Sequence, residues 1–172
     1  PLHLYKTLIK KNKIFTYSSN YTLYGDMSSR VMSALNHFVP NIEIYSIDEA
    51  FLSLKNFNIQ NLQDEMSKIR ECIYQWTGIP VSIGIGPTKT LAKLANKMAK
   101  KSSLNGVCVL TISNQLTHIL SGMKLEDIWG VSKGWGNRLR AVGINNPKQL
   151  QQANPRQIRT LISVVGERIV YE

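Results

Sequence analysis

The chain has 172 residues, of which 43% are hydrophobic, and a formal net charge of +10. This hydrophobic content is enough for a packed core and excludes a wholly disordered chain. The apolar runs are short, which excludes a transmembrane helix. The length fits one large domain or two small ones. The two cysteines, Cys72 and Cys108, are too few for a disulfide framework or a zinc site and are typical of free thiols in a reducing cytosol.

The positive charge is concentrated in the second part of the chain. Residues 1–71 hold 8 basic and 7 acidic side chains, whereas residues 72–172 hold 13 basic and 4 acidic ones. No acid occurs between Cys72 and Leu125. This surplus favours a polyanionic partner, with nucleic acid ahead of a membrane surface. A general solubilising charge is the alternative that composition alone leaves open.

Helical and strand patterns alternate over residues 23–112. Apolar residues at spacings of three and four predict a first helix, which Pro40 ends. The remaining predicted elements are strands over 42–47 and 50–54 that form a tight hairpin, a helix over 61–76 that ends at Gly78, a strand over 81–85, a helix over 88–101 and a strand over 106–112. This order predicts an α+β fold in which helices pack on one face of a mostly antiparallel sheet.

The pattern changes after residue 112, where strand signals stop and short helical segments alternate with glycine and proline. This predicts a domain boundary near residues 110–115, followed by a small all-helical domain. Residues 1–13 carry four lysines and one short apolar patch, a composition that assigns them to neither part.

Two adjacent carboxylates, Asp48 and Glu49, lie between the predicted hairpin strands. Acids beside such apolar segments need a compensating positive charge. Carboxylates at a hairpin tip can share a divalent cation, and Mg²⁺ prefers such oxygen ligands while leaving room for substrate phosphates. Two such ions, about 3.5–4 Å apart, can activate a hydroxyl and stabilise the leaving oxygen of a phosphoryl transfer. Two solvated turn residues are the alternative interpretation.

The predicted helix over 88–101 carries a row of lysines opposite its apolar face, at about 100° per residue. No acid is near these lysines in the sequence, whereas solvated helix faces usually mix charges of both signs. A lysine ammonium is suited to phosphate, so the row predicts phosphate contact. An ordinary solvated face is the alternative. The row consists of Lys89, Lys93, Lys97, Lys100 and Lys101.

A glycine-containing turn within residues 127–144 predicts a second phosphate site. A short helix ends near Gly130, and another helix begins a few residues later. Backbone N–H groups at such a turn form an anion-binding concavity, and Lys133, Arg138 and Arg140 add positive charge. The pattern matches a helix-hairpin-helix, which holds the DNA backbone without reading bases. A helical hairpin that merely reverses the chain fits the spacing equally well.

Five segments occur in a fixed order along the chain: YSSNY at 17–21, LYGDMS at 23–28, EIYSIDEAF at 43–51, GIGPTKTLAKLAN at 84–96 and DIWG at 127–130. Together they resemble Y-family translesion DNA polymerases, and within that family the UmuC branch, which includes the catalytic subunit of the bacterial SOS mutagenesis polymerase. The resemblance spans nearly the whole chain. Each motif alone is moderately specific, but the ordered set is specific.

The resemblance implies a partial polymerase palm at 13–110 and a helical thumb at 111–172, with residues 1–12 as the end of the fingers or a linker. It implies that Asp48 and Glu49 are catalytic residues that bind two Mg²⁺ ions, and that Lys100 contacts the triphosphate of the incoming nucleotide. The residues it assigns to DNA are Lys89, Lys93, Gly130, Val131, Ser132, Lys133 and Gly134. Ser132 stands where the family usually has glycine, the residue that most easily admits a close backbone approach.

The resemblance also implies parts that this chain does not contain. In the family, an N-terminal palm strand supplies a further metal-binding Asp and is followed by an aromatic residue that excludes ribonucleotides. The fingers add Tyr and Arg contacts to the triphosphate, and a little finger domain holds damaged DNA. We therefore expect this 172-residue piece to be a fragment that does not polymerise alone, and we expect the missing strand to be encoded upstream of Pro1.

The implied function is template-directed nucleotidyl transfer past damaged DNA in the SOS response to DNA damage. The expected partners are primer–template DNA and deoxynucleoside triphosphates, with SOS accessory subunits and a sliding clamp reached through absent regions, and no membrane. The expected location is the bacterial cytoplasm. One alternative is a non-catalytic DNA-binding module that uses only the lysine helix and the turn. A nucleotidyl cyclase-like palm is a third interpretation, against which the duplex-gripping turn argues.

Overall fold

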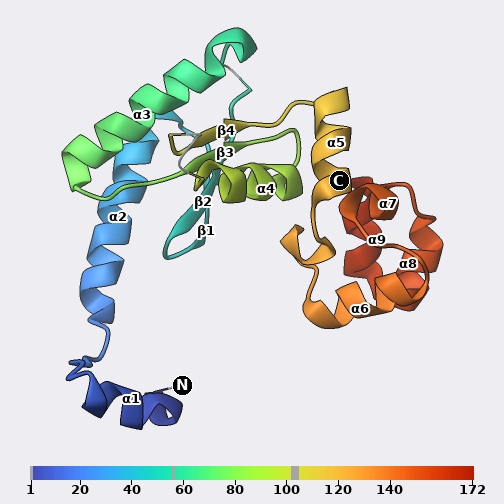
Figure 1. Ribbon diagram of the computed structural model, residues 1–172. Coiled ribbons are helices and arrows are strands. Elements are labelled where there is room, and N and C mark those ends of the chain that lie inside the picture. Colours follow the sequence, from blue (N-terminus) through green and yellow to red (C-terminus); the bar gives the residue numbers. More distant parts are fainter. Residues whose placement is uncertain (1, 56, 102–104) are drawn as a thin grey trace.

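The computed structural model describes residues 2–55, 57–101 and 105–172 (Figure 1). Two short N-terminal helices, η1 (Leu2–Tyr5) and α1 (Lys6–Lys11), come first. The next elements are α2 (Tyr21–Phe38), β1 (Ile42–Ser46), β2 (Glu49–Leu52), η2 (Ile59–Asn61), α3 (Leu62–Thr77), β3 (Ile83–Ile85), α4 (Lys89–Ala99) and β4 (Val107–Val109). The last are α5 (Asn114–Gly122), η4 (Leu125–Asp127), α6 (Lys133–Ala141), α7 (Pro147–Gln151), α8 (Pro155–Leu161) and α9 (Val164–Tyr171). The predicted α+β class is confirmed.

The strands of the described residues form two separate pairs. Strands β1 and β2 are antiparallel, with Ile42 opposite Leu52 and a register shift between Ile44 and Ser46. Strands β3 and β4 are parallel, with Gly84 opposite Cys108. Within the described residues, β2 and β3 are not hydrogen-bonded to each other, and no other strand connects them. Instead, a trough lies between β2 and β3. It consists of two hollows of about 220 and 950 Å³, and residues of both strands line each hollow.

The prediction of one mostly antiparallel sheet with helices on one face is wrong in two respects. Strand β4 is parallel to β3 because helix α4 connects them, and such a crossover returns the chain in the same direction. Helices also cover both faces of this pair: Val107 packs with α2 and α3, whereas Cys108 packs with α4. Parallel strands covered on both faces consist of continuous apolar runs, as in residues 107–110, rather than alternating ones.

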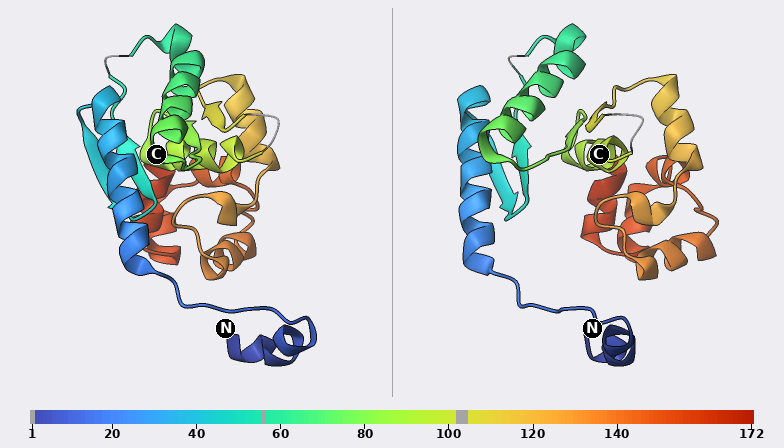
Figure 2. Two further views of the ribbon diagram at one scale, coloured as in Figure 1. Left: turned by 90° about the vertical axis from the view of Figure 1, so that its left-hand side faces the viewer. Right: turned by 60° about the vertical axis from the view of Figure 1, so that its left-hand side comes forward.

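Two hydrophobic cores can be distinguished among the residues that the structure describes. One lies between α2 and α3 and includes Met66, Ile73 and Val107. The other contains the apolar face of α4 together with residues of β4 and of every helix from α5 to α9. Figure 2 shows the consequence: α4 lies between the hairpin and α2 on one side and the bundle of the last helices on the other. The change from strands to helices after β4 agrees with the predicted pattern.

Helix α4 is held by its local sequence as well as by its core. The hydroxyl of Thr88 accepts the N–H of Leu91 at its first turn, which satisfies one of the free N–H groups of a helix start. Gly84 on β3 allows the helix to cross at backbone contact, because a Cβ there would lie 1.9 Å from the Asn96 nitrogen. Asn96 in turn donates from Nδ2 to the Ser82 carbonyl at 2.8 Å. These contacts fix the rotation of α4 and therefore the direction of its lysine row.

The N-terminal segment lies apart from the rest of the molecule (Figures 1 and 2). Its two helices, η1 and α1, bury no residue, and an extended stretch connects them to α2. The described residues include no helix that combines the length and the apolar composition needed to cross a membrane.

Candidate functional site

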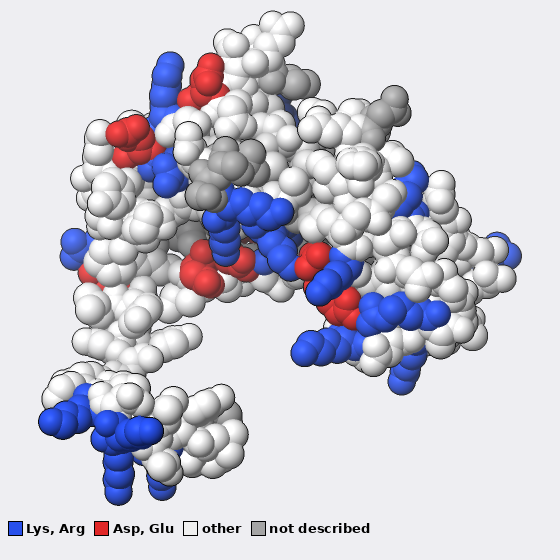
Figure 3. All heavy atoms as spheres, in the orientation of Figure 1, with Lys and Arg blue, Asp and Glu red and all other residues white. Residues whose placement is uncertain are grey.

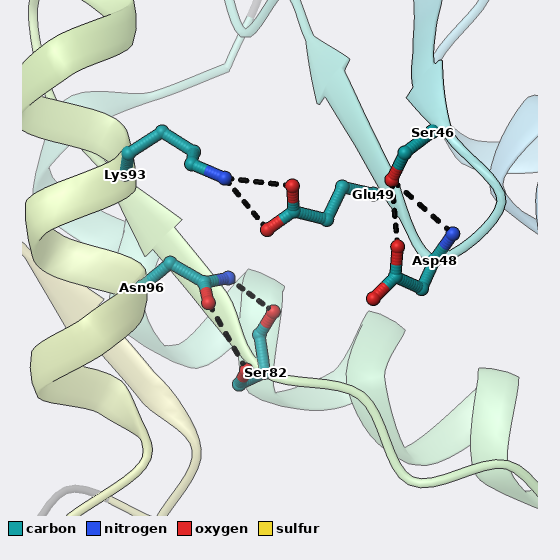
Figure 4. Close-up of polar contacts among 6 residues, drawn as sticks. All are labelled: Ser46, Asp48, Glu49, Ser82, Lys93 and Asn96. Atoms are coloured by element: carbon teal, nitrogen blue, oxygen red, sulfur yellow. Dashed lines mark hydrogen bonds and ion pairs between the residues drawn. The ribbon is translucent and has the colours of Figure 1, made fainter. Parts of the chain in front are cut away.

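The two sequence-predicted carboxylates lie at the tip of the β1–β2 hairpin (Figure 4). Asp48 is exposed in the turn, and its Oδ1 accepts the Ser46 hydroxyl at 2.6 Å. Glu49 is the first residue of β2 and is half-buried. Glu49 points toward α4, and Asp48 lies beside it at the end of the trough. The hairpin thus brings two carboxylates to one edge of the structure.

Three lysines of α4 pair with three acids that are distant in sequence. Lys89 contacts both carboxylate oxygens of Glu43 at 2.6 Å. Lys93 contacts both oxygens of Glu49 at 2.7 Å, and Lys97 contacts Asp127 at 2.5 Å. The fold therefore brings acids from β1, β2 and η4 to three lysines that have no acid near them in the sequence. Their contact with phosphate stays a prediction.

Aromatic rings surround two of these ion pairs. Tyr45 of β1 packs edge-on against Trp129, with 5.5 Å between ring centroids, and Phe51 of β2 lies 5.8 Å from the same indole. The ammonium of Lys93 lies over Tyr45 and Trp129, and that of Lys89 lies 5.0 Å from the centroid of Phe51. An aromatic face attracts such cations. The cluster joins the hairpin to the turn before α6.

A hollow of about 590 Å³ opens beside the carboxylates. Glu49 and Lys93 form one wall, and η4 and the turn after it form the other. Lys100 lies at this rim, immediately after α4, and makes no ion pair within the described part of the chain. An uncompensated ammonium at the mouth of a polar hollow suits an anionic group.

The glycine turn (residues 128–132) connects η4 to α6. Gly130 has a φ of 89°, a left-handed conformation that glycine adopts without strain. Ser132 begins α6, and its hydroxyl accepts the N–H of Trp135. The N–H groups of Lys133 and Gly134 have no hydrogen-bond partner within the described residues. The predicted turn before a helix start is thus present, and the Ser132 hydroxyl stabilises that helix start.

An ion pair braces the turn from the side. Arg140 of α6 forms a bidentate contact with Glu126 at 3.3 and 2.5 Å. The hydrogen bond from Arg140 is the main reason why the pKa of Glu126 lies below its ordinary value, and the same bond raises the pKa of Arg140. Arg140, which adds positive charge beside the turn in the sequence-based interpretation, is therefore paired with Glu126.

Asp127 ties the glycine turn to α4. Partial burial raises the pKa of its carboxyl, but hydrogen bonds from Lys97 and from the Lys124 backbone more than offset this, so the pKa lies below its ordinary value of 3.8. The carboxyl bonds Lys97 through Oδ1 and the Lys124 N–H through Oδ2. A lowered pKa means that the charged form is favoured in the folded state.

Replacing Asp127 by Asn should lower the free energy of unfolding by about 1 kcal/mol at neutral pH. The carboxyl has a lower pKa when folded, so its contribution is present above its unfolded pKa and is lost as the pH falls through the folded pKa. The difference between wild type and D127N should therefore close on acidification, as thermal unfolding from about pH 5 to about pH 2 would show. Asp26→Asn, in an exposed pair with Arg30, is the control and should change stability little. A gap that persists unchanged in acid would contradict this role.

The residues at the hairpin tip fit a divalent cation in donor chemistry, but they do not complete a site. Asp48 and Glu49 offer the carboxylate oxygens that Mg²⁺ prefers, and Asp48 Oδ2 has no partner within the described residues. No group of three potential ligands occurs in that part of the chain. Both Glu49 oxygens are occupied by Lys93.

Opposite charges lie side by side where the hairpin, α4 and the glycine turn meet (Figure 3). A second group of basic side chains covers the separate N-terminal segment; it consists of Lys6, Lys10, Lys11 and Lys13. The surplus of positive charge in residues 72–172 is therefore partly neutralised by ion pairs at this site.

Sequence reasoning missed Glu43 and Trp129 as members of this site. Glu43 occupies an exposed position on β1, and only the pairing of β1 beside α4 brings it to Lys89. The signal in the sequence was the four-residue spacing of Lys89, Lys93 and Lys97, which places their ammonium groups on one face of a helix at successive turns. Trp129 adjoins the predicted turn, but its packing against the hairpin depends on the tertiary fold.

The family model and the curated relatives that match this chain point to the same family. The impB/mucB/samB family matches residues 2–97. Protein UmuC of Salmonella typhimurium is 40% identical over 175 residues, which cover 100% of this chain and 42% of UmuC. Protein SamB of Salmonella typhimurium is 41% identical over 163 residues, which cover 92% of this chain and 38% of SamB. The chain thus spans less than half the length of these curated relatives.

Solved structures of DNA polymerases share the fold. An insertion ternary complex of Dbh DNA polymerase superposes with a TM-score of 0.75 at 26% identity, over 88% of this chain and 44% of that one. DinB from Sulfolobus solfataricus gives a TM-score of 0.77 at 25% identity, over 91% of this chain and 46% of that one.

Proposed function

The chain belongs to the impB/mucB/samB family, and from this premise we propose that it is the palm and thumb portion of an error-prone DNA polymerase that copies damaged DNA. The observation that carries the proposal is that Asp48, Glu49 and Lys100 line one hollow, and that Glu49 and Lys100 also line the neighbouring hollow beside the glycine turn. In this proposal the palm is residues 13–110 and the thumb residues 111–172. The substrates are primer–template DNA and a deoxynucleoside triphosphate.

Asp48 and Glu49 hold the catalytic cations in the intact polymerase. Two Mg²⁺ ions, when bound, supply the charge that activates the primer hydroxyl and neutralises the leaving phosphate. Lys100 adds an ammonium at the mouth of the hollow, where it binds the triphosphate and orients it toward the carboxylates. The contribution of the chain is positioning and charge neutralisation, which are the main sources of rate in phosphoryl transfer.

The trough between β2 and β3 accommodates one further strand in the intact polymerase. Its two sides are the edges of β2 and β3, and Asp48 and Glu49 lie at one end of it. Unpaired strand edges favour the addition of a strand, and a strand in this place would complete a single sheet. Such a strand carries the third acidic ligand beside Asp48 and Glu49.

The glycine turn and α6 hold the backbone of the duplex. The N–H groups of Lys133 and Gly134 and the exposed ammonium of Lys133 provide donors for one phosphate. Contacts of this kind fix the register of the duplex without reading its sequence. Lys89 and Lys93 contact DNA only after release from Glu43 and Glu49, since both lysines are neutralised in this structure.

Duplex binding to the full chain tests the DNA part of the proposal. Lys133→Ala should weaken binding about equally for duplexes of unrelated sequence and should make the salt dependence shallower by about one unit of logarithmic slope. Fluorescence anisotropy with labelled duplexes at several salt concentrations measures both quantities. Lys68→Ala removes the same charge from α3, far from the turn, and should leave the slope unchanged. Equal effects of the two variants would show that only overall charge matters.

A further inference from the structure

The ion pair between Lys93 and Glu49 differs from its neighbour one turn earlier on α4. The side chains of Lys93 and Glu49 are 22% and 39% exposed, whereas those of Lys89 and Glu43 are 47% and 60% exposed. Both oxygens of Glu49 contact the same ammonium at 2.7 Å. Partial exclusion from water weakens screening and makes the charge on Lys93 count for more at Glu49.

Lys93 also has a second set of partners. Its Nζ lies 5.5 Å from the centroid of Tyr45 and 5.8 Å from that of Trp129. The two rings contact each other and come from different parts of the fold, the hairpin and the glycine turn. An ammonium that leaves Glu49 therefore remains over two aromatic faces and does not have to be transferred wholly into water. The flexible stem of lysine permits such a short movement.

We propose that Lys93 is a positioning residue that acts as the resident counter-cation of Glu49, and that it must release Glu49 before this carboxylate can hold a divalent cation. The inference rests on the proposed role of Asp48 and Glu49. In this structure Lys93 pairs with Glu49 and holds it toward α4 (Figure 4). Release shifts the ammonium toward Tyr45, Trp129 and the adjoining hollow. Lys93 thus lowers the affinity of Asp48 and Glu49 for a divalent cation and sets the cation concentration at which these carboxylates become occupied.

Terbium luminescence measures this competition directly. Tb³⁺ binds carboxylate oxygens as other hard cations do, and it emits when an excited indole lies nearby, as Trp129 does here. Lys93→Met keeps the length of the side chain and removes its charge. We expect Tb³⁺ to half-saturate K93M at a concentration about threefold to tenfold lower than the wild-type chain. Lys93→Arg keeps the charge and should titrate like the wild type.

Lys89→Met is the matched control, because Lys89 lies on the same face of α4 and pairs with Glu43 in the same way. Equal tightening in K89M and K93M would overturn the proposal, since overall charge would then explain both. No tightening in K93M, with binding abolished in Glu49→Gln, would overturn the role of Lys93 and leave the cation role of Glu49 intact. Binding unaffected by Glu49→Gln would overturn both. Circular dichroism melting of each variant verifies folding, and Lys93→Gln replaces K93M if that variant does not fold.

Discussion

Asp48→Asn and Glu49→Gln in the intact polymerase are each expected to reduce nucleotide incorporation by about a thousandfold or more. Each change removes a formal charge from the pair that we propose to bind the catalytic cations, while the size of the side chain is kept. Binding of primer–template DNA should remain or become tighter, because fewer carboxylates then repel the phosphates. Single-nucleotide primer extension and DNA binding measured on the same preparation separate these two effects.

Glu43→Gln is the control for this experiment. Glu43 lies on the same hairpin and pairs with a lysine of α4 at the same distance from both oxygens, yet it does not belong to the proposed pair. The rate of nucleotide incorporation by the Glu43→Gln variant should stay within about threefold of the wild-type rate. If Asp48→Asn left synthesis unchanged, the assignment of the catalytic cations would be wrong. A non-catalytic DNA-binding module would then be the better description.

The second large effect is expected at Gly84, where Gly84→Ala should lower the free energy of unfolding by about 3 kcal/mol or more. A Cβ at this position would lie 1.9 Å from the nitrogen of Asn96 and 2.4 Å from the carbonyl oxygen of Ala92. Both are backbone atoms of α4, so the helix as a whole must move away from β3. The melting temperature should fall by about 6–12 °C for a chain of this size.

Gly25→Ala is the matched control for Gly84→Ala. Gly25 lies within α2, and no atom lies within 4 Å of a Cβ placed there. Alanine in an open helical position should stabilise the chain by about 0.5–1 kcal/mol. Thermal unfolding of the two variants should therefore shift in opposite directions. A melting temperature of G84A equal to that of the wild type would mean that α4 does not depend on close contact with β3.

Periodicity predicted the order of helices and strands well, because each element carries its own local signal. Gly78, for example, ends α3 with a φ of 71°, as its position in the sequence predicts. The direction of β4 could not be read in this way, because it depends on the crossover through α4. Strand β4 is also shorter than predicted and covers residues 107–109. Leu110, just after the strand, is buried in the core and donates its N–H to the Ile85 carbonyl at 2.8 Å, whereas Ile112 is exposed.

The residues of the candidate site were mostly predictable, but their pairing was not. Asp48, Glu49 and Lys100 stand in recognisable motifs, and the structure brings them to one hollow. The partners of Lys93 and Lys97 lie 44 and 30 residues away in the chain, so no local pattern reveals them. The number of lysines in the sequence therefore overestimates the number of unpaired positive side chains beside the carboxylates.

The shared core of α4 and the last helices has a mechanical consequence. Leu91, Leu94 and Ala95 on one side of α4 pack with residues of α5 to α9, while the opposite side presents Lys93 and the helix leads directly into Lys100. Close-packed interiors transmit displacements rather than absorbing them. If the last helices rotate on binding a duplex, as the proposed function implies, that rotation would be passed along α4 to the ammonium groups beside Glu49. In the proposed polymerase, contact with the duplex and the position of the charges beside Asp48 and Glu49 would therefore be coupled through α4.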